Sequence, residues 1–132
     1  MAEKKATKSK KSKSKRRSVP QGNAFIKATY NNTIVTLTDQ KGDVLTWSSA
    51  GSCGFKGTRK ATPYAAQVAA EKAAENSKVF GLEKVDVFIK GIGAGREQSI
   101  RGLHSAGLNI LSITDTTPIP HNGCRQKKSR RV

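Results

Sequence analysis

Apolar and polar positions over residues 23–48 follow the pattern of β-strands. From residue 23 onward they alternate, with Phe25 and Lys27 on one side and Ile26 and Ala28 on the other, which is the two-residue period of a strand. The next two segments are rich in β-branched residues, which favour strands. These patterns predict a three-stranded antiparallel meander over residues 23–30, 33–38 and 44–48.

Two short polar segments separate these strands. Asn31-Asn32 is predicted to form a two-residue hairpin turn, because asparagine tolerates positive φ. The second segment, 39–43, contains a glycine between polar residues and is also predicted to be a turn.

The second half of the chain alternates between helical and strand patterns. Thr62 and Pro63 are favourable at a helix N-cap and first position, and the small residues that follow allow a helix to lie close to a sheet. Gly81 and Gly107 are predicted to end two helices, because glycine is favoured just after the last helical residue. The predicted elements are a helix at 63–79, a strand at 85–89, a helix at 96–106 and a strand at 110–114.

The order of elements is therefore β-β-β-α-β-α-β. Helices between the later strands imply crossover connections, so we expect a single α/β domain with a mixed sheet and two helices. The domain is predicted to span residues 21–117. It lies between a disordered basic extension, 1–20, and an extended basic arm, 118–132.

The net charge of +16 is concentrated in these two tails. Residues 1–20 carry nine Lys or Arg and one acid, and residues 121–132 carry five Lys or Arg and no acid. The hundred residues between them carry eleven basic and eight acidic residues. Basic ends on a nearly balanced body are typical of a polyanion binder. The main alternative on charge alone is a chromatin-like protein that binds nucleic acid generally.

The C-terminal arm has a sequence of its own. Pro118 and Pro120 restrict φ and favour an extended path, and Asn122-Gly123 favours a tight turn. The cations beyond this turn are expected to lie along a negative partner. Asn122 precedes a glycine, so succinimide formation and deamidation at this position are a further hypothesis.

Two loops contain residues that are candidates for binding phosphate groups. In the loop over 49–60, we interpret Lys56, Arg59 and Lys60 as contacts to backbone phosphates. Phe55 either stacks on a base or packs within the protein. The glycine-rich turn at 91–96 has arginine where a dinucleotide-binding G-x-G-x-x-G motif requires glycine. Gly93, Gly95 and Arg96 therefore form either an anion-binding turn or a tight turn with a solvated arginine.

The sequence gives little support for metal binding, catalysis or insertion into a membrane. His121 and Cys124 have a metal-like spacing, but a zinc site needs four ligands and only His104 and Cys53 remain. The acidic residues form no catalytic or two-metal pattern. No apolar run approaches the roughly 20 residues of a membrane span. We therefore expect no enzyme activity, no cofactor, no metal and no membrane partner.

Several motifs resemble one family. Tyr-Asn-Asn-Thr-Ile-Val (30–35), Trp-Ser-Ser-Ala-Gly (47–51), Gly-Phe-Lys-Gly (54–57), Lys-Ala-Thr-Pro-Tyr-Ala-Ala (60–66), Gly-Arg-Glu (95–97) and Asp-Thr-Thr-Pro-Ile-Pro-His-Asn-Gly-Cys-Arg (115–125) occur in this order. Together they resemble the small ribosomal subunit protein eleven family, in its bacterial or plastid form, over about residues 20–132.

The resemblance implies a structural, non-enzymatic role in translation. It implies a ribonuclease-H-like arrangement without that fold's catalytic carboxylates, and a ribosomal location in the cytoplasm or in a plastid. The expected partner is small-subunit, 16S-type ribosomal RNA in the platform, near the messenger exit and the Shine–Dalgarno region. Messenger RNA and the seventh and eighteenth small-subunit proteins are expected nearby.

The resemblance also implies which residues contact RNA. Together with the loop residues above, the expected ribosomal RNA-binding residues are Asn31, Asn32, Phe55, Lys56, Gly57, Arg59, Lys60, Gly93, Gly95, Arg96, His121, Asn122, Gly123, Arg125, Lys127, Lys128, Arg130 and Arg131.

Three features depart from the family pattern. Ile92 and Gln126 stand where proline is common, so the turn at 91–96 and the end of the arm are expected to be less rigid. The Lys/Ser tract at 4–15 is not a family motif, and only electrostatic capture or a local RNA contact is expected of it.

Overall fold

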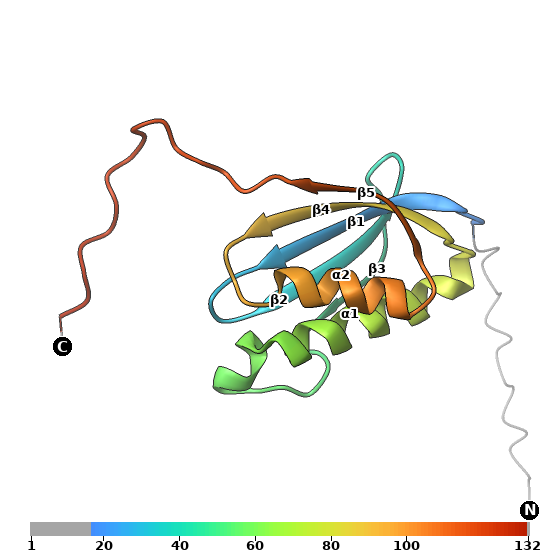
Figure 1. Cartoon of the computed structure of the whole chain (residues 1–132), viewed down its shortest axis with the longest axis horizontal. Coiled ribbons are helices and arrows are strands. Elements are labelled where there is room, and N and C mark those ends of the chain that lie inside the picture. The colour runs from blue at the N-terminus through green and yellow to red at the C-terminus, as the bar shows by residue number, and fades with distance from the viewer. Residues whose placement is uncertain (1–16, 132) are drawn as a thin grey trace, which may run out of the picture.

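A five-stranded sheet in the order β3-β2-β1-β4-β5 is the framework of the computed structural model, which describes residues 17–131 (Figure 1). The elements along the chain are β1 (Gln21–Ala28), β2 (Thr33–Asp39), β3 (Val44–Ser49), η1 (Gly57–Ala61), α1 (Pro63–Ser77), η2 (Lys78–Phe80), β4 (Lys84–Gly91), α2 (Arg96–Ser105) and β5 (Asn109–Asp115). The predicted order of strands and α-helices is confirmed. The predicted disorder of residues 1–20 falls mostly on residues outside the described part of the chain.

The sheet is mixed, as predicted. β1, β2 and β3 form the antiparallel meander, whereas β4 pairs parallel to β1 and β5 pairs parallel to β4. The crossover through α1 brings β4 beside β1, and the crossover through α2 brings β5 beside β4. β1 is therefore the central strand, with an antiparallel neighbour on one side and a parallel neighbour on the other.

Both α-helices lie on one face of the sheet (Figure 1). Every second residue of β1 from Ala24 to Ala28 is buried beneath them, and Val85 and Val87 of β4 are fully buried as well. The contacting side of α1 consists of alanines, which let the helix approach the strands closely; all are at most 1% exposed: Ala65, Ala66, Ala69, Ala70, Ala73 and Ala74. The small residues noted in the sequence thus form the helix side of the core.

The ends of the helices follow the local sequence. The Thr62 hydroxyl oxygen accepts a hydrogen bond from the Ala65 N–H at 3.3 Å, and Pro63 is the first helical residue, as predicted. α1 ends at Ser77, two residues earlier than expected, and a single 3-10 turn, η2, continues to Phe80. Gly81 then adopts a positive φ of 70°.

The first hairpin differs from the predicted two-residue turn at Asn31-Asn32. The last pair of the ladder is Ala28 with Thr33, so the loop is the four-residue segment 29–32. The Thr29 N–H donates to the Asn32 carbonyl oxygen at 2.8 Å, and the Thr29 hydroxyl bonds both the N–H and the carbonyl oxygen of Asn32. This side chain closes the loop without any positive φ at the asparagines, which is why the prediction was wrong.

Close packing of the two helices depends on Gly102 of α2. A Cβ atom at this position would lie 2.7 Å from the Gln67 carbonyl oxygen and 2.9 Å from the Ala70 Cβ. Both neighbours belong to α1 and cannot move without displacing that helix.

We therefore expect Gly102→Val to lower the free energy of unfolding by about 1–3 kcal/mol, the usual cost of overpacking. Valine has a better helix propensity than glycine, so a drop in stability arises from crowding. Urea denaturation measures the difference, with Ser105→Val, an exposed position on the same helix, as the control. Equal midpoints for the two variants would contradict the proposed packing.

Candidate functional site

Four segments singled out by the sequence gather at one end of the sheet, at the left in Figure 1. The loop 29–32 joins β1 to β2, the loop 50–61 follows β3, the turn 91–95 follows β4, and the arm begins after β5. Backbone hydrogen bonds connect them, since the Ala50 N–H donates to Thr33 and the Gly93 N–H donates to Ala28. We call this region, comprising 29–32, 50–61, 91–95 and 115–118, the loop end.

The two asparagines of the loop 29–32 differ, since one is exposed to solvent and the other is hydrogen-bonded within the loop. The Asn32 Oδ1 accepts a hydrogen bond from the Thr33 N–H at 2.9 Å, and its side chain is half-buried. Asn31 is exposed at the tip, beside Tyr30, which is 74% exposed. Asn31 can therefore contact a partner directly, whereas Asn32 shapes the loop.

The loop 50–61 carries exposed positive charge. Gly54 and Gly57 adopt positive φ values of 96° and 60°, which bend the chain before the 3-10 turn η1. Lys56 and Arg59 are exposed and Lys60 is half-buried. Within residues 17–131, the ion pairs are those of Arg17 with Asp39 and Asp43 and of Arg96 with Asp115. The three cations of this loop thus have no acidic partner in the described part of the chain.

One side of the Phe55 ring packs against another residue of the protein. Its ring meets the ring of Tyr64 edge to face, with centroids 5.9 Å apart, and it is half-buried. Tyr64, in the first turn of α1, is itself 66% exposed. The packing alternative for Phe55 is therefore present in the structure, and the aromatic surface that this pair leaves open belongs mostly to Tyr64.

Gly93 and Gly95 of the 91–95 turn allow close packing against neighbouring segments of the chain. A Cβ atom at Gly93 would lie 2.2 Å from the Thr29 carbonyl oxygen, and one at Gly95 would lie 2.3 Å from the Thr33 Oγ1. Both glycines are buried, and the Gly93 N–H donates to the Ala28 carbonyl oxygen at 3.0 Å. The Gly93 N–H is therefore directed into the protein and away from any bound anion.

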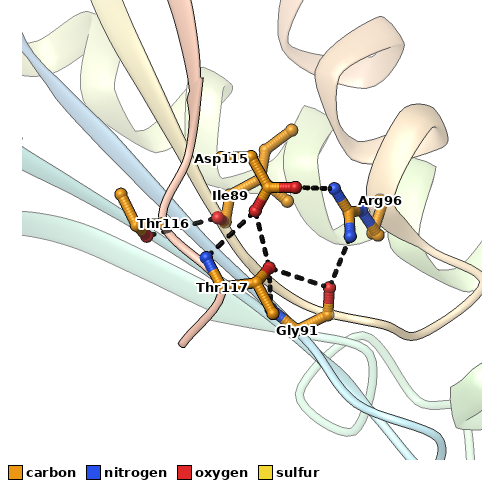
Figure 2. Close-up of polar contacts among 6 residues, drawn as sticks. All are labelled: Ile89, Gly91, Arg96, Asp115, Thr116 and Thr117. Carbon is orange, nitrogen blue, oxygen red and sulfur yellow. Dashed lines mark hydrogen bonds and ion pairs between the residues drawn. The ribbon is translucent and has the colours of Figure 1, made fainter. Parts of the chain in front are cut away.

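Arg96, the first residue of α2, binds two groups of the protein itself (Figure 2). One guanidinium nitrogen donates to the Gly91 carbonyl oxygen at 2.8 Å, and the other pairs with the Asp115 carboxylate at 2.6 Å. The guanidinium thus joins the end of β4 to the end of β5. The sequence left a choice between an anion-binding and a solvated arginine, and this internal bridge was not anticipated.

Thr116 and Thr117 complete the connection between the two strand ends (Figure 2). The Thr116 N–H donates to the Ile89 carbonyl oxygen at 2.8 Å, and the Thr117 hydroxyl donates to Asp115 Oδ1 at 2.6 Å. The Gly91 N–H donates to the Thr117 hydroxyl oxygen at 3.2 Å. We call the set of Gly91, Arg96, Asp115 and Thr117 the Arg96 latch. It fixes the chain up to the residue before Pro118.

The arm beyond the latch is exposed along most of its length. Residues 118–131 have no regular secondary structure, and they extend away from the loop end (Figure 1). Asn122, with φ of 58°, is the one non-glycine residue with positive φ among those described, consistent with the turn expected at Asn122-Gly123. His121 and the arm's cations all face solvent: Arg125, Lys127, Lys128, Arg130 and Arg131.

The residues that hold the arm in place were not predicted from the sequence. Asp115 and Thr117 were noted only as part of a motif, yet they anchor its start. A local signal existed, because aspartate followed two residues later by threonine favours a side-chain turn, and the next residue is a proline. The exposed side chains of Tyr30 and Tyr64 were likewise not predicted as site residues.

Residues 17–131 contain no group of three or more histidine, cysteine, aspartate or glutamate side chains placed to hold a metal ion. In the same range, no helix is both long and apolar enough to cross a membrane. His121 and Cys124 lie on the exposed arm, and Cys53 lies in the loop 50–61, 3.4 Å from the Ser48 hydroxyl.

Comparison with known proteins places these features in a family context. The model of the family described as ribosomal protein S11 matches residues 22–131. A curated relative, the small ribosomal subunit protein uS11 of Psychromonas ingrahamii, is 57% identical over 117 residues, which cover 89% of this chain and 91% of the relative. The family match therefore covers nearly all of the described residues and includes every motif on which the resemblance was based.

The Arg96 latch has a consequence for the titration of Asp115. The Thr117 hydroxyl and amide and the Arg96 guanidinium stabilise the carboxylate and lower the pKa of Asp115 from 3.8 to about 2. Because this pKa lies below its value in an unfolded chain, Asp115 stabilises the fold above about pH 4. That contribution disappears as pH falls through about 2.

We expect Thr117→Val to raise the pKa of Asp115 toward 3.8, since the largest stabilising interaction is the hydrogen bond from the threonine hydroxyl. The carboxyl carbon signal in an NMR titration measures this value directly. Thr114→Val, an exposed threonine of β5, is the matched control and should leave the midpoint of Asp115 in place. The same midpoint in both variants would show that the hydroxyl does not stabilise the carboxylate.

Proposed function

Because this chain belongs to the ribosomal protein S11 family, and is thus a structural constituent of the small ribosomal subunit, we propose that it binds 16S-type RNA in the platform, near the messenger exit. The family is one of structural ribosomal proteins and not of enzymes. The chain is therefore ribosome-associated and acts within a ribonucleoprotein in translation. Its proposed neighbours are the seventh and eighteenth small-subunit proteins, with messenger RNA nearby. Its proposed location is the cytoplasmic ribosome, with the plastid ribosome as the alternative.

The single observation that carries the proposal is the gathering of unpaired positive charge at the loop end. Lys56 and Arg59 project from the loop 50–61 without an acidic partner in the described residues. The arm, with five further cations, starts from the same end of the sheet. An extended polyanion that contacts the loop would therefore meet the arm as well, and RNA has this shape and charge.

The core and the arm have different parts in the proposed binding. The folded core positions the loop end, and phosphate contacts there set the orientation of the protein on RNA. The arm orders along a groove only on assembly, so its conformational entropy decreases when it binds. Phosphate contacts carry little sequence information, and specificity therefore comes mainly from the shape of the RNA.

Arg96 has an indirect role in this scheme. Its guanidinium is occupied by Gly91 and Asp115, so it acts on RNA binding by fixing the start of the arm. Gly93 and Gly95 act in the same way, because they allow the close approach that places the first turn of α2. Direct contacts are assigned to Asn31, to the cations of the loop 50–61 and to the arm from His121 onward.

Comparing ribosomal RNA with duplex DNA tests the proposal. Binding is measured at about 150 mM salt, where non-specific DNA binding is weak, with a Kd of roughly 10⁻⁴–10⁻⁶ M. We expect the full chain to bind small-subunit ribosomal RNA at least ten-fold more tightly than duplex DNA of equal length. Equal affinities would favour a general nucleic-acid-binding protein and contradict the assignment.

The loop cations give a residue-level prediction. The double variant Lys56→Gln/Arg59→Gln should weaken binding to ribosomal RNA and lower the slope of log affinity against log salt by roughly 0.7–0.9 for each phosphate that is no longer bound. Lys41→Gln/Lys78→Gln removes the same charge from exposed positions that lie outside the loop end. If both double variants show the same decrease in affinity and slope, only the net charge matters and the loop end is not the interface.

A further inference from the structure

The face of the sheet opposite the helices carries a row of aromatic side chains. In β1, Ala24 and Ile26 lie beneath the helices and are at most 1% exposed, so Phe25 and Lys27 point to the other side. No helix among the described residues covers this side of the sheet, because α1 and α2 lie on the same face (Figure 1). A large part of the sheet therefore faces solvent.

The strand register places one residue of each strand in a line across this face. From β3 to β5, the residues in register are Trp47, Thr36, Phe25, Phe88 and Thr114. The rings of Phe25 and Phe88 are stacked, with centroids 5.3 Å apart and an angle of 17° between their planes. Trp47 is 60% exposed and Phe25 is 42% exposed. Trp47 and Phe25 are two strands apart, about 10 Å, and Thr36 lies between them in the register.

Two lysines flank the aromatic row on the side of the loop end. Lys27 follows Phe25 by two residues, Lys90 follows Phe88 by two residues, and the two lysines are partners in the parallel register. Both are exposed, and neither has an ion pair within residues 17–131. Like charges in register on neighbouring strands repel each other, and a bound anion relieves that repulsion.

The acid on this face lies on the other side of the aromatic row. Asp86 precedes Phe88 by two residues and accepts a hydrogen bond from the Ser112 hydroxyl at 2.7 Å. Lys84 precedes Asp86 by two residues and is exposed on the same face, so the charges of these two residues offset each other. The net positive charge of this face therefore lies toward the loop end. A ligand that carries both aromatic rings and anionic groups fits this face, because its rings can lie on the aromatic row while its anionic groups lie at the two lysines. The same anionic chain can then continue to the loop end, where phosphate contacts are proposed.

We propose that this face binds single-stranded RNA, with unpaired bases stacked on Phe25 and Trp47 and with phosphates bound by Lys27 and Lys90. The proposal rests on the RNA-binding function above and adds a second surface to the loop end. Aromatic side chains on an open sheet are a general means of binding unpaired bases, and stacking contributes much of the affinity. A protein partner fits less well, because an apolar surface laid over the row would bring two unpaired lysines toward a dry interface.

Trp47, the single tryptophan of the chain, gives a local readout. The full chain is titrated with a short unstructured oligouridylate at about 150 mM salt, and tryptophan fluorescence is recorded. We expect quenching by the single strand and little quenching by the same RNA in a duplex, because duplex bases cannot stack on the protein. RNA bound only to the basic arm leaves Trp47 unquenched, and that result would overturn the proposal.

Two variants assign the effect to this face. Phe25→Leu keeps an apolar side chain but removes the ring, and it should weaken oligouridylate binding between roughly 5-fold and 150-fold, the range for removal of one stacked base. Phe80→Leu, the same change outside the sheet, is the matched control. The double variant Lys27→Gln/Lys90→Gln changes exposed residues only, and it should lower the salt slope by about 1.4 for two contacts to a single strand.

The outcomes separate this inference from the proposed function. If Phe25→Leu and the lysine double variant bind oligouridylate as Phe80→Leu does, the open face is not an RNA surface. A preference of the full chain for ribosomal RNA over DNA would still stand in that case. If the face variants bind RNA normally but fail to join the small subunit, the face contacts a protein neighbour and the inference is overturned.

Discussion

The close packing of the 91–95 turn against the loop 29–32 and the start of β2 is the constraint on which the arrangement of the loop end depends. The backbone at Gly93 and Gly95 approaches Thr29 and Thr33 so closely that neither position has room for a Cβ atom. This approach sets the start of α2 and hence the position of Arg96. The Arg96 guanidinium then holds Asp115, and the Asp115 carboxylate holds Thr117. The direction in which the arm leaves the sheet therefore follows from the packing of the 91–95 turn against the segment that joins β1 to β2.

The distribution of charge fits this arrangement. The folded region is nearly balanced, so it forms a core without strong self-repulsion, while most of the excess charge lies in the tails. The arm has few apolar residues with which to form a core of its own, and in the proposed complex the RNA orders it. Ordering costs about 1–2 kcal/mol per residue in backbone entropy. Because the latch already fixes residues 115–117, that cost begins only at Pro118.

Much of the fold could be predicted from local sequence. The alternation around Phe25, the cap at Thr62 and the small side chains of α1 each have a direct local reason, and the structure agrees with all three. The loop 29–32 was predicted wrongly because the Thr29 side chain, and not an asparagine with positive φ, closes it. That the candidate loops meet at one end follows from strand pairing, which joins segments far apart in sequence.

The site was less predictable than the fold for a similar reason. A glycine-rich turn before a helix has the same sequence pattern whether its glycines face a phosphate or a neighbouring strand, and only the packing against Thr29 separates the two. Arg96 has its partner nineteen residues away, on a strand that becomes its neighbour only in the folded sheet. The open face of the sheet was visible in the alternation of β1, but its aromatic row depends on the register of all five strands.

In the proposed complex, the arm and the loop end form one RNA-binding surface. The most direct measurement is the salt dependence of ribosomal RNA affinity for the full chain and for a chain that ends at Pro120. We expect weaker binding by the shortened chain and a slope smaller by roughly 0.7–0.9 for each phosphate contact that the arm makes. An unchanged slope would show that the arm's cations do not contact phosphates and that the arm is not part of the RNA-binding surface.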